Sequence, residues 1–272
     1  MPPSTIQTFS LQPEDTNLFM DKVAEASAIM SLSERLRANG NGRGKTIHNF
    51  NDVEAKFQMA KGDEKETSKY TDTPYQLDYY PLYIIVEIDK RDAKDGKLLY
   101  DRLVTKSAAA IGRSFDKIIF SGTGVPPTNF DKLSTAATVQ IPTPNTRPGF
   151  IEALTKISEG DYELNGWILS NVAKGLMAGT VDANGNPIYT SYDNLLGSRV
   201  LYRGKTFATG TIGFAGDWTQ AVFSDIEGVQ FTQTSEGLTL LKRNAIAFRV
   251  EAEVGFRISN IAAFRKLIPK TA

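Results

Sequence analysis

The 272-residue chain contains no cysteine, and His48 is its only histidine. Disulfides, thiolate nucleophiles and cysteine-ligated zinc are therefore excluded. A serine-hydrolase triad, a histidine metal centre or a histidine acid–base pair would each depend on His48, which lies near glycines and asparagines. Chemistry based on carboxylates or lysines remains possible, but we expect no catalytic residue, no metal site and no cofactor.

Net charge and long apolar runs are also missing. The 31 basic and 31 acidic residues cancel, so no overall field would attract nucleic acid or an anionic membrane. The most apolar run, residues 79–88, is interrupted by Pro81 and Glu87 and is far shorter than a membrane span. Residues 1–15 carry three prolines and lack the basic-then-apolar pattern of a signal peptide. We expect a protein made in the cytosol, with no membrane partner.

Two loops resemble ligand motifs but lack required residues. Gly44-Lys45-Thr46 ends like a P-loop, yet Asn39 stands where the motif needs its first glycine. The segment 182–187 resembles the start of an EF-hand, but Pro187 and Asp193 replace the required glycine and glutamate. We interpret the first loop as a flexible linker and the second as a turn.

Hydrophobic periodicity predicts a long rod. Apolar residues at three- and four-residue spacing predict a helix over 16–38 and a longer one over 92–121. Strict alternation predicts a strand over 246–258, about 43 Å long at 3.3 Å per residue. Residues 82–88 predict a more buried strand. We expect the long helix and the long strand to pack together.

Alternation at 53–59 and again at 75–79 predicts a hairpin with a long, charged tip. A two-stranded ribbon is only marginally stable alone, so a neighbouring subunit is a candidate support for it. The charged residues of the tip are candidates for contacts between subunits: Lys61, Asp63, Glu64, Lys65, Glu66 and Lys69.

Residues 133–234 predict a mixed α/β unit inserted between the two parts of the rod. Its expected helices and short strands lie at 147–158, 167–169, 171–177, 200–202, 221–224 and 229–232, the last two strands being joined through 227–228. Residues 263–268 predict a closing strand. A rod, a hairpin, an N-terminal arm and an inserted unit are a poor shape for a lone enzyme, so we predict a self-assembling structural protein.

Several segments carry a family resemblance when taken in order. Tyr83-Ile-Ile-Val-Glu-Ile88 leads into the long helix, which closes on Phe115-Asp-Lys-Ile-Ile-Phe-Ser-Gly-Thr-Gly124. Gly216-Asp-Trp218 and Asn186-Pro-Ile-Tyr189 form turns in the middle, and the long strand runs into the Ala-Phe…Leu ending of 244–267. In this order and spacing, residues 45–268 resemble the major capsid proteins of tailed bacteriophages, which have the Hong Kong 97-type fold.

The resemblance implies an α+β fold in four parts. These are an N-terminal arm and helix (1–45), an extended E-loop hairpin (46–82), a P-domain with the spine helix and the long strand (83–135 and 236–260), and an A-domain (136–235), with 261–272 as closing strand. Copies would form pentamers and hexamers in the host cytoplasm and close into an icosahedral virion shell around double-stranded DNA. Its partners would be other copies, a portal, a separate scaffolding protein, decoration proteins and DNA bound without sequence specificity.

Some relatives cross-link an E-loop lysine to an asparagine of a neighbouring subunit, with a glutamate as proton acceptor. The resemblance places Asn244 and Glu251 on the matching strand, with Lys61, Lys65 and Lys69 near the hairpin tip. We prefer a simpler interpretation, in which Asn244 begins a strand, Glu251 pairs across its polar face and the lysines are solvated.

Basic residues on the polar face of the long helix could face DNA or could be ordinary solvated residues: Lys94, Lys97, Arg102, Lys106, Arg113 and Lys117. Two other functions also remain open at this point. One is an encapsulin-type nanocompartment of the same fold, which would enclose a cargo enzyme. The other is a soluble nucleotide-binding or carboxylate-dependent enzyme that uses the glycine linker.

Overall fold

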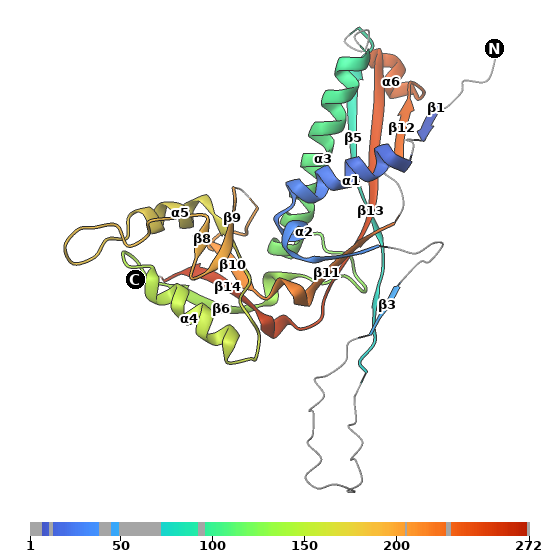
Figure 1. Ribbon diagram of the computed structural model, residues 1–272. Helices are drawn as coiled ribbons and strands as arrows, with labels where there is room; N and C mark the ends of the chain where they lie inside the picture. Colours follow the sequence, from blue (N-terminus) through green and yellow to red (C-terminus); the bar gives the residue numbers. More distant parts are fainter. Residues whose placement is uncertain are drawn as a thin grey trace, which may run out of the picture.

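The part of the chain that the structure describes forms two six-stranded sheets and a two-stranded ribbon (Figure 1). The computed structural model describes residues 7–10, 13–37, 45–48, 72–91, 96–204, 206–226 and 230–270. One sheet is elongated and carries the longest helix along its length, and the other forms a separate lobe beside it (Figure 1). This mixture of helices and strands agrees with the predicted α+β class.

The elongated sheet is built around β13 (Ala245–Ile258). Residues 247–251 of β13 pair with β12 (Gln230–Thr234) and with β5 (Tyr80–Asp89), so these two strands lie on opposite edges. β11 (Ala221–Asp225) shares the edge of β12, because Val254 of β13 pairs with both β11 and β5. Two N-terminal strands complete the sheet: β1 (Gln7–Ser10), antiparallel to β12, and β2 (Glu34–Arg37), parallel to β11.

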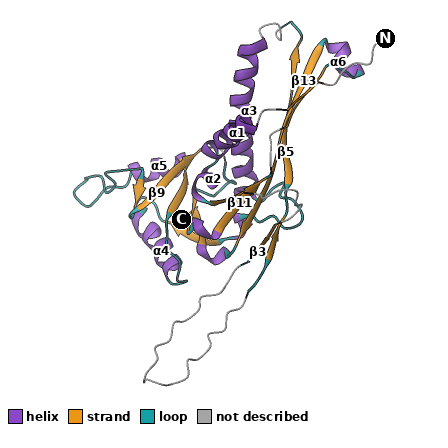
Figure 2. Ribbon diagram, turned by 45° about the vertical axis from the view of Figure 1, so that its right-hand side comes forward, coloured by secondary structure: helices purple, strands orange, loops and turns teal. Residues whose placement is uncertain are grey.

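The long helix α3 (Gly96–Ser121) covers one face of this sheet, as Figure 2 shows. Ile111, Phe115 and Ile119 form its buried stripe, and the Phe115 ring meets the Phe256 ring of β13 edge to face at 5.8 Å. The predicted packing of the long helix on the long strand is therefore confirmed. α1 (Pro13–Ala26) packs in turn on α3 at Gly112, where a Cβ atom would lie only 2.6 Å from the carbonyl oxygen of Val23.

The second sheet forms the lobe at the left of Figure 1. Its strands follow in the order β6 (Ala137–Ile141), β14 (Phe264–Pro269), β10 (Gly213–Gly216), β7 (Gly166–Ser170), β9 (Ser198–Arg203) and β8 (Asn194–Leu195). The helices α4 (Arg147–Ser158) and α5 (Asn171–Ala178) pack on this sheet around the buried Trp167. The predicted helices at 147–158 and 171–177 and the closing strand are confirmed.

Smaller elements complete the described chain. β3 (Lys45–Ile47) and β4 (Tyr75–Leu77) form the antiparallel ribbon, and α6 (Leu238–Arg243) precedes β13. Single turns of 3-10 helix lie at Leu133–Thr135, Trp218–Gln220 and Ile261–Ala263. The predicted strand at 53–59 lies outside the described residues.

The single helix predicted over 16–38 is wrong. The chain leaves the helix at Ser27, whose backbone is extended, and begins a second short helix, α2 (Ala28–Leu32). The Ser27 hydroxyl accepts from the amide of Met30 and caps this helix, which favours the break. Residues 34–37 then form β2, because their backbone groups pair with β11.

Two predictions about short strands also need correction. The strands at 221–224 and 229–232 are present, but they do not belong to the inserted unit: β11 and β12 lie in the elongated sheet, where each pairs with β13. The strand at 82–88 was expected to be buried, whereas alternate residues of β5 are exposed, among them Tyr83 at 60% and Ile85 at 57%. Helix α3 covers only the other face of this strand.

Candidate assembly surface

The root of the predicted E-loop is fixed by close packing. Residues 75–80, here called the E-loop base, comprise β4, the two residues that connect it to β5 and the first residue of β5. Leu77 is fully buried, and it lies directly against Gly255 of β13. A Cβ atom at position 255 would contact the Leu77 side chain and would lie only 2.6 Å from the carbonyl oxygen of Asp78. Only glycine leaves room for the E-loop base at this point.

Polar contacts hold the same residues to two other segments, the end of β13 and the loop at Asn129. The Tyr75 hydroxyl lies 2.8 Å from the Ser259 hydroxyl, and the Arg257 guanidinium lies 5.3 Å from the centre of the Tyr75 ring. The Asn129 side-chain amide donates to Asp78 at 2.8 Å. The direction in which the ribbon leaves the sheet is therefore set by packing and by hydrogen bonds together.

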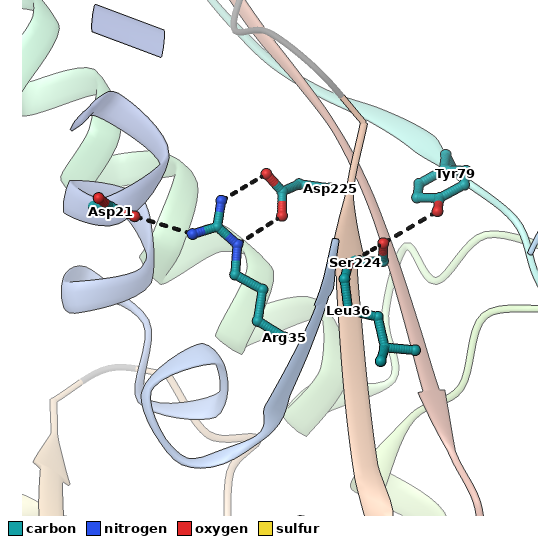
Figure 3. Close-up of polar contacts among 6 residues, drawn as sticks. All are labelled: Asp21, Arg35, Leu36, Tyr79, Ser224 and Asp225. Atoms are coloured by element: carbon teal, nitrogen blue, oxygen red, sulfur yellow. Dashed lines mark hydrogen bonds and ion pairs between the residues drawn. The ribbon is translucent and has the colours of Figure 1, made fainter. Parts of the chain in front are cut away.

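The N-terminal segment, residues 13–37, is held to the sheet by an ion-pair network (Figure 3). Arg35 donates from Nε and Nη2 to the two carboxylate oxygens of Asp225, each at 2.9 Å, and from Nη1 to Asp21 at 3.0 Å. The hydrogen bonds that Arg35 donates to Asp225 raise the pKa of Arg35 above its ordinary value. A two-pronged arrangement of this kind fixes geometry as well as charge, so α1, β2 and β11 are joined at one point.

A buried carboxylate joins the N-terminal segment to the long helix. Asp116 of α3 has no exposed surface and accepts from the Ser27 hydroxyl at 2.5 Å and from the amides of Ala28 and Ile29 at 2.8 and 3.2 Å. Arg203 of the second sheet lies 3.6 Å away. Burial raises the pKa of Asp116 to about 6, although each of these four partners favours the charged form. Three separate parts of the fold meet at this one side chain.

The basic residues predicted on the long helix are placed only in part. Lys106, Arg113 and Lys117 are exposed, and at 100° per residue they lie on one stripe opposite the buried Phe115. The side chains of Lys97 and Arg102, and the whole of Lys94, lie outside the described residues.

Of the two residues that match the cross-linking pattern of some relatives, Asn244 lies next to the first pair of the β5–β13 pairing and Glu251 lies within it. Asn244 does not begin the strand as predicted: it ends α6 in the left-handed conformation, at φ 51°, and β13 starts at the next residue. Glu251 lies opposite Tyr83 and forms an ion pair with Arg249 at 3.2 Å. The predicted tip contacts Lys61, Asp63, Glu64, Lys65, Glu66 and Lys69 lie outside the described residues.

His48 and the loop at Asp182 are each held by ordinary polar contacts, whereas residues 38–44, most of the P-loop-like segment, lie outside the described residues. The His48 ring lies 2.5 Å from Asp72 and is more than half exposed. Asp182 accepts from the amides of Asn184 and Asn186, so its loop is a hydrogen-bonded turn, as predicted. Among the residues that the structure describes, no group of His, Asp or Glu could hold a metal ion, and no helix is long and apolar enough to span a membrane.

Sequence reasoning missed the residues that hold the parts together. Gly255 had one local signal, since a glycine inside a strand often marks a close backbone approach. Asp116 is an acidic residue next to the apolar stripe, but its partners at 27–29 are almost ninety positions away. The Arg35–Asp225 pair spans 190 positions and had no local signal.

A long helix packed on a long strand, with a second sheet beside it and a ribbon at the sheet edge, defines a shell subunit of the Hong Kong 97 type. The chain belongs to the phage capsid family, whose model matches residues 8–268.

Relatives and solved structures agree with this assignment. The chain is 23% identical over 282 residues to the "Probable major capsid protein gp17" of Mycobacterium phage D29, an alignment that covers 93% of this chain and 88% of that one. A solved structure from Gordonia phage Cozz matches with a TM-score of 0.72 at 15% identity, covering 90% of this chain and 87% of the other. The capsid of an empty GTA particle matches with a TM-score of 0.68 at 13% identity, covering 100% and 96%. At these identities, the solved structures show the fold.

Proposed function

We infer that the chain is the major capsid protein of a tailed phage, and we propose that its copies form pentamers and hexamers that close into an icosahedral shell around double-stranded DNA. The observation that carries this conclusion is the family match over residues 8–268, together with the Hong Kong 97-type arrangement of α3 on β13. The protein therefore assembles with itself and belongs to the virion. The encapsulin alternative is not favoured, because the family and the curated relatives are those of phage capsids.

The finer parts of the proposal concern the domains and the other partners. We propose the four-part division into arm, E-loop, P-domain and A-domain, with β11 and β12 counted in the P-domain because they pair with β13. A portal, a separate scaffolding protein, decoration proteins and DNA are the proposed partners. We propose that the subunit works through its shape and its contacts with other copies, and that it has no catalytic activity.

Assembly is the first prediction. Electron microscopy of the expressed protein, with and without neighbouring phage gene products, should show closed shells, tubes or capsomers. A strictly monomeric species near the chain mass of 29.9 kDa under all conditions would contradict the proposal. Shells formed by this chain alone would remove only the need for a separate scaffolding protein.

The second prediction concerns covalent cross-links. Because Glu251 already pairs with Arg249 and Asn244 lies in a turn, we expect assembled particles to give one band near 29.9 kDa on a denaturing gel. A ladder of multiples would contradict this expectation. In that case Glu251→Gln should abolish the ladder, while Glu253→Gln on the same strand should leave it unchanged.

The third prediction tests whether the exposed stripe of α3 faces DNA. If Lys106, Arg113 and Lys117 each contact a phosphate, changing all three to glutamine should reduce the slope of log affinity for double-stranded DNA against log salt by about 2–3. The matched control replaces three exposed cations on other elements: Lys132, Arg199 and Lys242. Equal slopes for the two triple variants would assign the stripe to ordinary solvated residues.

A further inference from the structure

A chain of hydroxyl groups joins the N-terminal segment to the E-loop base (Figure 3). Ser224 of β11 is fully buried, and its hydroxyl donates to the carbonyl oxygen of Leu36 at 2.5 Å. The Tyr79 hydroxyl lies 3.1 Å from the Ser224 oxygen. A serine hydroxyl has one proton, and here the Leu36 carbonyl takes it, so Tyr79 must be the donor to Ser224. The order of donation is therefore Tyr79 to Ser224 to Leu36.

The two ends of this chain lie on elements far apart in the sequence. Leu36 is held in β2, directly after Arg35, and Ser224 directly precedes Asp225, so the ion pair and the hydroxyl chain share the same two strands. Tyr79 lies in the E-loop base, between β4 and β5. Parallel pairing of β2 with β11 sets Leu36 opposite Ser224. If β2 leaves the sheet edge, Ser224 loses its acceptor and its hydroxyl can turn toward another partner, which weakens one of the contacts that position Tyr79.

We propose that docking of the N-terminal segment on β11 controls the position of the E-loop base through Ser224. With β2 docked, the three-residue chain holds Tyr79 and therefore the start of β5. With β2 undocked, the buried Ser224 hydroxyl must find another partner, and the E-loop base is released from this side. A subunit whose N-terminal segment has left the sheet would in this way hold its E-loop base differently. The coupling lies within one subunit, so its test is separate from the test of shell formation.

Hydrogen exchange of the full-length, unassembled subunit tests the coupling. Arg35→Met keeps an unbranched apolar chain but removes the bonds to Asp225 and Asp21. We expect amide exchange to rise in β2 and also at residues 75–79, in each case by about tenfold or more, as for the loss of a buried hydrogen bond. In a Tyr79→Phe background, the same change should still free β2 but should add nothing at residues 75–79.

Tyr80→Phe is the matched control. It removes a hydroxyl of the same E-loop base that donates to the carbonyl oxygen of Thr128 at 2.8 Å and has no bond to β11. In this background Arg35→Met should still accelerate exchange at residues 75–79. Faster exchange in β2 without any change at residues 75–79 would overturn the proposal. The proposal would also be overturned if Arg35→Met failed to accelerate exchange at residues 75–79 in the Tyr79→Phe and Tyr80→Phe backgrounds alike.

If amide exchange in β2 stays slow in Arg35→Met, the variant Ser224→Ala tests the coupling instead. It removes the middle of the chain while Arg35 and Asp225 stay in place. We expect faster exchange both in β2 and at residues 75–79. Wild-type exchange rates at residues 75–79 in this variant would overturn the proposal.

Discussion

Replacing Asp116 by alanine is expected to lower the free energy of unfolding of the subunit by about 3–5 kcal/mol, the usual cost of breaking a buried charged network. The substitution leaves the Ser27 hydroxyl and the amides of Ala28 and Ile29 without their acceptor, and it leaves Arg203 without its counter-charge. Denaturant titration of the unassembled subunit at neutral pH measures the loss. Because Asp116 joins the N-terminal segment to α3, α1 and α2 should be the first elements to lose protection.

Asp182→Ala is the matched control for this substitution. Asp182 also accepts two backbone amides, from Asn184 and Asn186, but its turn is exposed to water. Water can replace those hydrogen bonds, so the loss of unfolding free energy in Asp182→Ala should be small compared with the loss in Asp116→Ala. Similar losses in both variants would show that burial of the Asp116 network contributes little.

The difference between the wild type and Asp116→Ala should also depend on pH. Burial raises the pKa of Asp116 to about 6, from an ordinary 3.8, so between these values the folded state binds the proton more tightly than the unfolded state. Stability that comes from this group therefore increases as the pH falls from about 6 to about 4. The gap in unfolding free energy between the two proteins should widen over this range. A gap that narrows instead would contradict the assigned direction of the shift.

Local sequence patterns were sufficient to predict those elements in which one buried face determines the secondary structure. The apolar stripe of α3 and the alternation of β13 each continue over several turns or residue pairs, and both elements form as predicted. The helices α4 and α5 and the strand β7 are also present where short patterns placed them. In these elements the buried side chains are set by nearby spacing, so the sequence alone is informative.

Elements whose partners are distant could not be predicted in this way. The helix breaks at Ser27 because Asp116, on another helix, accepts the free amides that follow the break. Residues 34–37 form a strand because the open edge of β11 is available. Tyr83 and Ile85 give β5 an apolar outer face, which suggested burial, but within the described chain that face stays exposed. In each case the structure depends on a partner that is distant in the sequence, or on the lack of such a partner within the described chain.

A single methyl group at Gly255 should strongly impair shell assembly. In Gly255→Ala the new Cβ atom would contact Leu77 and would lie 2.6 Å from the carbonyl oxygen of Asp78, which is backbone and cannot rotate away. The E-loop base must therefore move, while the rest of β13 can keep its pairing. We expect the subunit to fold with a loss of about 1–3 kcal/mol, as for other overpacked sites.

The effect on assembly should exceed the effect on folding, because every subunit of a closed shell carries the same displaced E-loop base. If the displaced E-loop base lowers the binding free energy of a contact between subunits by about 1.4 kcal/mol, the affinity of that contact falls about tenfold. Counting closed particles by electron microscopy at equal protein concentration should therefore show at least about a tenfold decrease. Gly175→Ala in α5 is the control, because nothing lies within 4 Å of a Cβ atom there. If Gly255→Ala assembles as well as Gly175→Ala, the angle of the E-loop base does not limit assembly, and contacts made elsewhere on the subunit must set it.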